Sequence, residues 1–153
     1  MSVSSQLLST ISQGVKSFSA FSAAQYSSKI NKMNAMLVEQ NAKYSRAKGE
    51  LEAQRLHRIG LEVAGSQRAA FGASGVSVGT GTPVDVVTDT FTRSDIDASM
   101  ARYNAELEAF GFEVEASNYT AASRADDMKA TQSLLGLGST LLTSATSLQK
   151  KYQ

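Results

Sequence analysis

FGASGVSVGTGTPVDV, residues 71–86, is the one stretch of this chain that is not expected to form a helix. It contains four glycines and the only proline, and segments rich in Ala, Leu, Glu, Lys, Gln and Met lie on both sides of it. Those six residue types favour helix, whereas glycine weakens a helix and proline breaks one. The stretch therefore predicts the tip of a long antiparallel helical hairpin, which makes the protein all-α. The predicted tip residues are Gly72, Gly75, Gly79, Gly81 and Pro83.

This hairpin divides the chain into five segments. A Ser-rich amphipathic segment is expected at 1–28, a first long helix at 29–72, the glycine-rich tip at 73–82 and a second long helix at 83–130. A Ser/Leu/Gly-rich amphipathic segment follows at 131–153. The length is that of a single domain.

The residues beside the tip predict how the second helix starts and how the two helices face each other. Thr82 can serve as the N-cap, Pro83 suits the first helical position, and Asp85 lies at the positive end of the helix. If the chain turns between Ser77 and Val78, residues equally distant from this point face each other. Opposite charges then come close: Glu52 to Arg102, Lys48 to Glu106 and Glu108, Lys43 to Glu113, Lys29 to Asp126 and Asp127, and Arg58 to Asp95 and Asp97.

A stripe of large apolar residues runs along the second helix. Its members recur every three or four residues: Ile96, Met100, Tyr103, Leu107, Phe110 and Val114. Such a repeat is typical of a helix that packs along its length in a coiled coil, although an amphipathic helix of a small bundle carries the same stripe. We expect these residues to form an oligomer or packing face. In the first helix, Gly49, Gly60 and Gly65 each cost roughly 1 kcal/mol relative to Ala, and they allow another backbone to approach.

The two end segments contain almost no charge. Lys16 is the only charged residue between residues 3 and 28, and residues 131–149 have none. The apolar residues of each segment recur at helical spacing: Leu7, Ile11, Val15 and Phe18 in the first, and Leu134, Leu137, Leu141 and Leu148 in the second. One interpretation is a frayed Ser-rich end. The other is that these residues face a membrane when several copies assemble, because one such segment is too polar to span a bilayer alone.

The composition gives little reason to expect an enzyme. The chain has no Cys, a single His and a net charge of +1, so neither a thiolate site nor general nucleic-acid binding is indicated. His57 lies between basic residues with no partner for catalysis or metal binding, and GVSVGTG lacks the Lys-Ser/Thr of a phosphate loop. We expect no catalytic, metal or cofactor site. The first fifteen residues contain no Lys or Arg, so no ordinary signal peptide is predicted.

Residues 67–116, QRAAFGASGVSVGTGTPVDVVTDTFTRSDIDASMARYNAELEAFGFEVEA, resemble the small internal virion proteins of short-tailed bacteriophages. These proteins are also called ejection proteins. The resemblance is carried by Arg68-Ala69-Ala70, Gly72, Ser74-Gly75, the Gly-Thr-Pro helix start at residues 81–83, Asp97, and Arg102-Tyr103-Asn104. It implies a protein stored in the capsid near the portal that leaves with or before the DNA. The smallest member of that family is thought to build a channel in the host outer membrane.

The resemblance also implies partners. They would be other copies of the chain in a homo-oligomeric ring or tube, other internal virion proteins or the portal, and the host outer membrane after ejection. DNA would pass through the lumen without sequence-specific binding. The expected location is the virion and then the host cell envelope. Two alternatives remain open: a permanent core or head–tail adaptor ring protein of the virion, and a secreted bacterial helical translocator.

Overall fold

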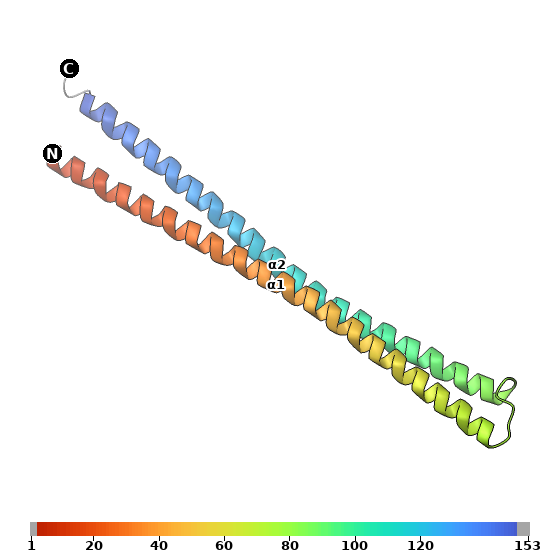
Figure 1. Cartoon of the computed structure of the whole chain (residues 1–153). Coiled ribbons are helices and arrows are strands. Elements are labelled where there is room, and N and C mark those ends of the chain that lie inside the picture. The colour runs from red at the N-terminus through yellow and green to blue at the C-terminus, as the bar shows by residue number, and fades with distance from the viewer. Residues whose placement is uncertain (1–2, 150–153) are drawn as a thin grey trace. The chain divides into compact units, whose positions relative to one another are not determined.

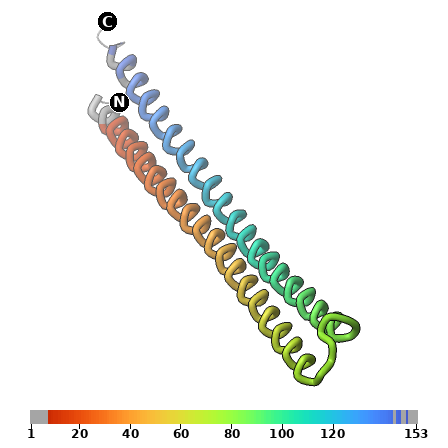
Figure 2. Tube along the Cα trace, turned by 45° about the vertical axis from the view of Figure 1, so that its right-hand side comes forward, coloured from red at the N-terminus to blue at the C-terminus, as the bar shows by residue number. Residues whose placement is uncertain are grey.

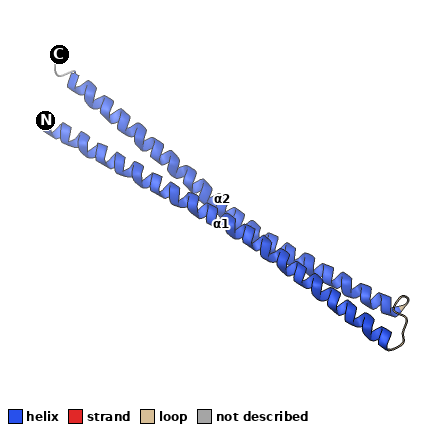
Figure 3. Cartoon of the chain, in the orientation of Figure 1, coloured by secondary structure: helices blue, strands red, loops and turns tan. Residues whose placement is uncertain are grey.

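The protein consists of two helices joined by a loop (Figure 1). The computed structural model describes the backbone of residues 3–149 and the side chains of residues 8–143, 145, 146 and 149. Helix α1 spans Val3–Ala73 and helix α2 spans Thr82–Gln149. Figure 3 shows no strand in this part of the chain, so the all-α prediction is confirmed. The end segments continue the two helices without a break as far as the structure describes them.

The loop ends α1 with a Schellman motif. The Val76 N–H donates to the Phe71 carbonyl and the Gly75 N–H donates to the Gly72 carbonyl, each at 3.1 Å. Gly75 has a φ of 75°, a left-handed conformation that glycine adopts without strain. The tip glycine Gly72 itself belongs to α1.

Helix α2 begins one residue earlier than the cap assignment predicts. The Gly81 carbonyl accepts hydrogen bonds from the N–H groups of Val84 (3.0 Å) and Asp85 (3.3 Å), which places Gly81 rather than Thr82 at the N-cap. Gly81 has a φ of 71°, so its backbone rather than a Thr side chain sets the entry into the helix. Pro83 is buried in the first turn, where its missing N–H costs no hydrogen bond.

The chain forms two compact units, which we describe separately. The loop unit, Val38–Val114, contains the loop and the parts of α1 and α2 next to it. The terminal unit combines Met1–Leu37 with Glu115–Gln153. Within the loop unit the two helices run in opposite directions, as the sequence predicts, and Figure 2 shows this arrangement from a second side.

The helices of the loop unit pack along a seam of small residues. Its buried small residues are Ala42, Ser45, Gly49, Ala53, Gly60 and Ala64 on α1 and Ser94, Ala98, Ala105 and Ala109 on α2. The larger residues buried in this unit are Val38 on α1 and Pro83 and Val87 on α2. Gly49 faces Ala105, where the predicted turn point places Glu106, and Gly60 faces Ser94. Seam hydroxyls also bond the opposite backbone: Ser45 Oγ donates to the Ala105 carbonyl (3.1 Å) and Ser94 Oγ donates to the Leu56 carbonyl (2.9 Å). The small side chains therefore let the backbones come close.

The terminal unit contains a polar cluster between its helices. The hydroxyls of Ser28 and Ser123, both buried, lie 3.1 Å apart. The carboxylate of Asp126, also buried, accepts hydrogen bonds from Ser27 (2.6 Å), Asn31 (3.1 Å) and Lys129 (3.0 Å). Among the described side chains, none between residues 8 and 27 and none after Ala130 is buried. The polar cluster and Ala130, one turn beyond Asp126, are therefore the outermost buried part of this unit among the described side chains.

Candidate functional site

The apolar stripe predicted on the second helix, here called the α2 stripe, lies on the outside of the loop unit. Its six residues, Ile96, Met100, Tyr103, Leu107, Phe110 and Val114, are between 47% and 61% exposed. Ile96 lies two positions from Ser94 and Ala98, and Leu107 lies two positions from Ala105 and Ala109. Two positions correspond to a rotation of roughly 200° around a helix, so the α2 stripe faces away from the seam.

This finding corrects one possible interpretation of the α2 stripe. If these residues packed the two helices against each other, they would be buried, but small residues occupy the seam instead. A role of the α2 stripe in contacts with other chains stays a prediction. Helix α1 has a smaller outer face of the same kind, because Tyr44 is 72% exposed and Leu51 is 67% exposed. Leu51 lies two positions from the seam residues Gly49 and Ala53.

One side of the loop unit is lined by ion pairs between the helices. Arg46 binds Glu106 (2.7 Å) and Glu113 (2.8 Å), and Arg102 Nε lies 2.7 Å from Glu50 Oε2. The hydrogen bonds from Arg46 lower the pKa of Glu106, and those from Arg102 lower the pKa of Glu50. These carboxylates are therefore ionised at neutral pH. The side chains of His57 and Asp95 form a further exposed pair, with 3.0 Å between Nδ1 and Oδ1.

Four of the predicted α2 acids, Asp95, Glu106, Glu113 and Asp127, do pair with α1, but each with another residue than the predicted one. Among the described residues, Glu108 and Asp97 make no ion pair, and Asp126 pairs with Lys129 of its own helix. Glu106 and Glu113 bind Arg46 instead of Lys48 and Lys43, and Arg102 binds Glu50 instead of Glu52. Asp95 pairs with His57 instead of Arg58, and Asp127 pairs with Lys32 (3.0 Å) instead of Lys29. Distance from the turn was the only criterion for these predictions, and it ignores the side of the helix that a residue faces. Glu52 instead binds Arg55 on its own helix at 2.6 Å.

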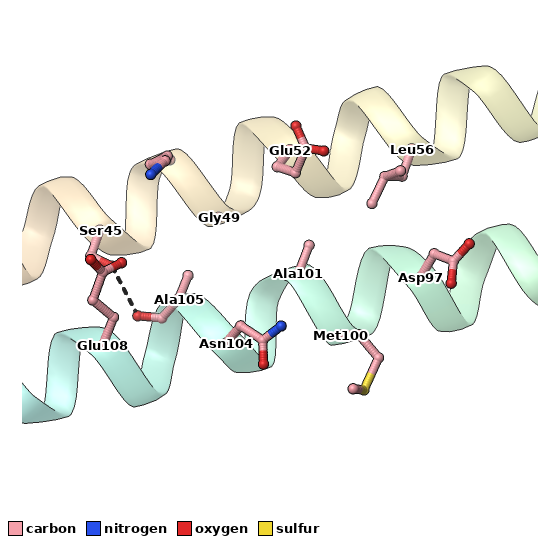
Figure 4. A pocket seen from close by; sticks show the side chains of 11 residues that line it. Ser45, Gly49, Glu52, Leu56, Asp97, Met100, Ala101, Asn104, Ala105 and Glu108 are labelled. Atoms are coloured by element: carbon pink, nitrogen blue, oxygen red, sulfur yellow. Dashed lines mark hydrogen bonds between the residues drawn. The ribbon is translucent and has the colours of Figure 1, made fainter.

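An open groove of about 480 Å³ runs along the loop unit next to the seam (Figure 4). Gly49, Ala101 and Ala105 leave room for it, and Leu56 and Met100 supply apolar surface. Its polar lining consists of Ser45, Lys48, Glu52, Asp97, Asn104 and Glu108. Ser45 Oγ donates to Glu108 at 2.6 Å.

The lining of the groove limits the chemistry that it can perform. It contains three carboxylates and one Lys, so basic or amphipathic side chains fit it best. The described residues contain no group of three or more His, Cys, Asp or Glu side chains placed to hold a metal ion. Sequence analysis did not find this groove, because its walls come from two segments far apart in the chain.

Most residues predicted to face a membrane are exposed in the terminal unit. Ile11, Val15, Phe18 and Leu141 are each 63% or 64% exposed, Leu134 is 47% exposed and Leu137 is half-buried. The side chains of Leu7 and Leu148 lie outside the described residues. Sequence analysis missed Leu135 and Leu142, which are each 70% exposed. Over the described residues, neither helix contains a stretch that is both long and apolar enough to cross a membrane.

The chain was also compared with known proteins. No protein-family model, curated protein or solved structure matches it. Its function must therefore be inferred from the surfaces of the two units and from the resemblance carried by residues 67–116.

Proposed function

We propose that the chain is an internal virion protein of a short-tailed phage, an ejection protein that oligomerises into part of the DNA-ejection conduit. The host outer membrane is the proposed site of this conduit. One observation carries the proposal: the six large apolar residues of the α2 stripe lie on the outside of the loop unit, whereas most buried residues of this unit are Ala, Ser and Gly, with Val38, Pro83 and Val87 as the exceptions. A hairpin with this arrangement is suited to packing between other helices.

The energetics of apolar surface support an assembly of copies. Removing apolar surface from water contributes roughly 25 cal/mol per Å². A contiguous exposed apolar patch of more than a few hundred Å² usually marks an interaction site. The α2 stripe exposes six large apolar residues along one face, and covering it with helices of other copies would bury them. Repeated side by side, such hairpins form a wall that can enclose a passage.

The charge of the chain is compatible with passage of DNA through such a wall. Tight, sequence-independent DNA binding requires many Lys and Arg residues on one surface. This chain has 15 Lys and Arg residues against 14 Asp and Glu residues, so its surface offers no strong general attraction for DNA. DNA would therefore move past it without being retained.

The end segments support a membrane role for the assembly. Their exposed apolar residues, such as Phe18 and Leu141, alternate with Ser and Thr along almost uncharged helices. Several copies together could turn apolar residues towards lipid and hydroxyls towards each other or towards water. Single helices need not be apolar enough to span the bilayer in such an arrangement.

The alternative function is a permanent core or head–tail adaptor ring of the virion. Such a ring would use the same contacts between copies but would need no membrane contact. A secreted bacterial helical translocator is the second alternative. Neighbouring genes for portal, capsid or lysozyme-bearing proteins would contradict the translocator.

Quantifying the chain in full virions and in particles that have released their DNA tests the proposal. The portal and capsid proteins serve as internal standards, because they stay with the particle. We expect the chain to be present in full virions and lost after DNA release. Retention at full copy number would support the adaptor, and absence from full virions would contradict both virion functions.

A further inference from the structure

The two helices of the loop unit carry opposite net charges. The α1 part, residues 38–73, contains six basic and four acidic residues, whereas the α2 part, residues 82–114, contains seven acidic and two basic residues. Pairs across the seam neutralise only some of these charges. Among the described residues, Lys43, Lys48 and Arg58 of α1 and Asp97 of α2 make no ion pair.

The charges that remain lie beside the two apolar outer faces. Arg58 follows Leu51 on α1 by two helical turns, so it extends the face that Tyr44 and Leu51 begin. Arg55, one turn after Leu51, lies on the same face but is paired with Glu52 of its own helix. On α2, Asp97 directly follows the stripe residue Ile96. The outer face of α1 is therefore apolar with a basic continuation, and the outer face of α2 is apolar with an acidic edge.

We infer that a second copy of this chain places the outer face of its α1 on the α2 stripe. The α1 face of one copy then contacts the α2 face of the next, which makes the contact heterologous. Contact between two α2 stripes would bring the Asp97 side chains of both copies together, and like charges across an interface are unfavourable. The α2 cation nearest to Asp97 in the chain, Arg93, is already paired with Asp89, whereas Arg58 of α1 makes no ion pair among the described residues. The inference rests on the oligomer of the proposed function and specifies its interface.

The available area fits a repeated contact. The six residues of the α2 stripe are each between 47% and 61% exposed and extend along roughly 27 Å of helix. A standard interface buries ~800 Å² per partner. The apolar face of α1 is smaller, so a single contact would be near the lower limit for stability. Each copy can make two such contacts, and a series of heterologous contacts closes into a ring or continues as a filament.

Charge reversal tests the direction of the contact. Arg58→Glu reverses the charge beside the α1 face, and Asp97→Lys reverses the charge beside the α2 face. We expect each variant alone to raise the concentration needed for assembly at least about tenfold, as measured by sedimentation velocity. Mixing the two variants should restore assembly, because the reversed α1 face then matches the reversed α2 face. Arg68→Glu is the control: it reverses another α1 cation that makes no ion pair among the described residues, and it lies away from the Tyr44–Leu51 face.

Cysteine cross-linking gives a second readout that does not depend on charge. The chain has no native Cys, so Leu51→Cys and Leu107→Cys can be prepared as separate single-cysteine proteins. A flexible bis-maleimide should join the two proteins when they are mixed, and should join either protein to itself far less.

Three outcomes would overturn the inference, and they can be told apart. If Arg58→Glu assembles normally while Leu107→Cys cross-links mainly to itself, the contact joins two α2 stripes. The proposed oligomer then stands, but its inferred α1–α2 interface is wrong. If the unmodified chain remains a 16.2 kDa monomer, the proposed conduit fails together with the inference. If that monomer also binds lipid vesicles and Leu107→Asp abolishes the binding, lipid covers the α2 stripe.

Discussion

Gly49 and Gly60 determine how closely the helices of the loop unit approach. A methyl group added at Gly49 would overlap the Cβ of Ala105, and one added at Gly60 would overlap the side chain of Ser94. Gly65 has no such neighbour. The sequence predicts close approach at all three glycines, and the structure places the opposite helix against only the first two. Helical spacing alone could not separate them, because it does not show which face meets the other helix.

Alanine substitutions should distinguish a glycine that contacts the opposite helix from one that does not. Gly49→Ala should destabilise the chain by about 1–3 kcal/mol, because overpacking forces the backbones apart. Gly65→Ala is the matched control and should stabilise it by up to ~1 kcal/mol, since alanine favours helix and no atom obstructs it. Urea unfolding followed by circular dichroism measures both. Equal effects of the two substitutions would contradict the close-packed seam.

Arg46 and Glu106 should give the chain a measurable sensitivity to acid. The hydrogen bond from Arg46 lowers the folded-state pKa of Glu106 below the ordinary value of 4.5. A carboxyl group of this kind stabilises the fold above its unfolded pKa, and this stability is lost as pH falls through the folded pKa. The thermal midpoint of Glu106→Gln should therefore lie below that of the unmodified chain at pH 7. The difference should be small because the pair is exposed, and it should vanish in acid.

Glu39→Gln is the control for this titration, because Glu39 makes no ion pair among the described residues. Its thermal midpoint at pH 7 should stay close to that of the unmodified chain. A difference for Glu106→Gln that stays constant from pH 7 down to acid would argue against the pair.

At the scale of the helices, the sequence predicted the elements and their direction but left the packing face unresolved. The Gly-rich stretch at 71–86 and the helix-forming segments beside it were enough to predict two antiparallel helices. The sequence predicted a packing face from the residues of the α2 stripe, because large apolar residues dominate a hydrophobic pattern. Ala105 and Ala109 recur with the same helical spacing but contribute little apolar area each, so their burial could not be predicted. Which face is buried follows from the three-dimensional fit of small side chains.

Substitutions at neighbouring positions of α2 can test this assignment. Ala109 is fully buried in the seam, and Leu107 is 53% exposed on the α2 stripe. Ala109→Gln should lower the free energy of unfolding by about 1–3 kcal/mol at every protein concentration. Leu107→Gln should change the stability of dilute protein by no more than about 0.5 kcal/mol, as is usual for exposed positions. It should also remove any rise of the thermal midpoint with protein concentration. The reverse ranking in dilute protein would make the α2 stripe the packing face within the chain.

At the scale of the whole molecule, the sequence predicted amphipathic ends, and the structure continues them into α1 and α2. Their membrane role can be tested with Leu134→Asp combined with Leu141→Asp, which places two charges on the predicted lipid-facing side of α2. Each charge at mid-bilayer costs on the order of 2.5–3.5 kcal/mol, so dye release from liposomes should be lost. Leu137 is left unchanged because it is half-buried.

The pair Leu135→Asp and Leu142→Asp is the matched control. Both leucines are exposed on a different side of the same helix, so dye release should persist if only the predicted face meets lipid. Loss of dye release in the control alone would assign the lipid-facing role to Leu135 and Leu142. Equal dye release by both variants and the unmodified chain would favour the adaptor ring.

The central claim is that other copies of the chain cover the bulky apolar residues on the outer faces of the loop unit. Sedimentation equilibrium of the 153-residue chain, in the absence of detergent and lipid, tests it most directly. We predict a mass that is a multiple of the 16.2 kDa chain at micromolar concentrations, and Leu107→Gln should shift it towards the single-chain mass. A chain that sediments as a 16.2 kDa species at every concentration would contradict the claim.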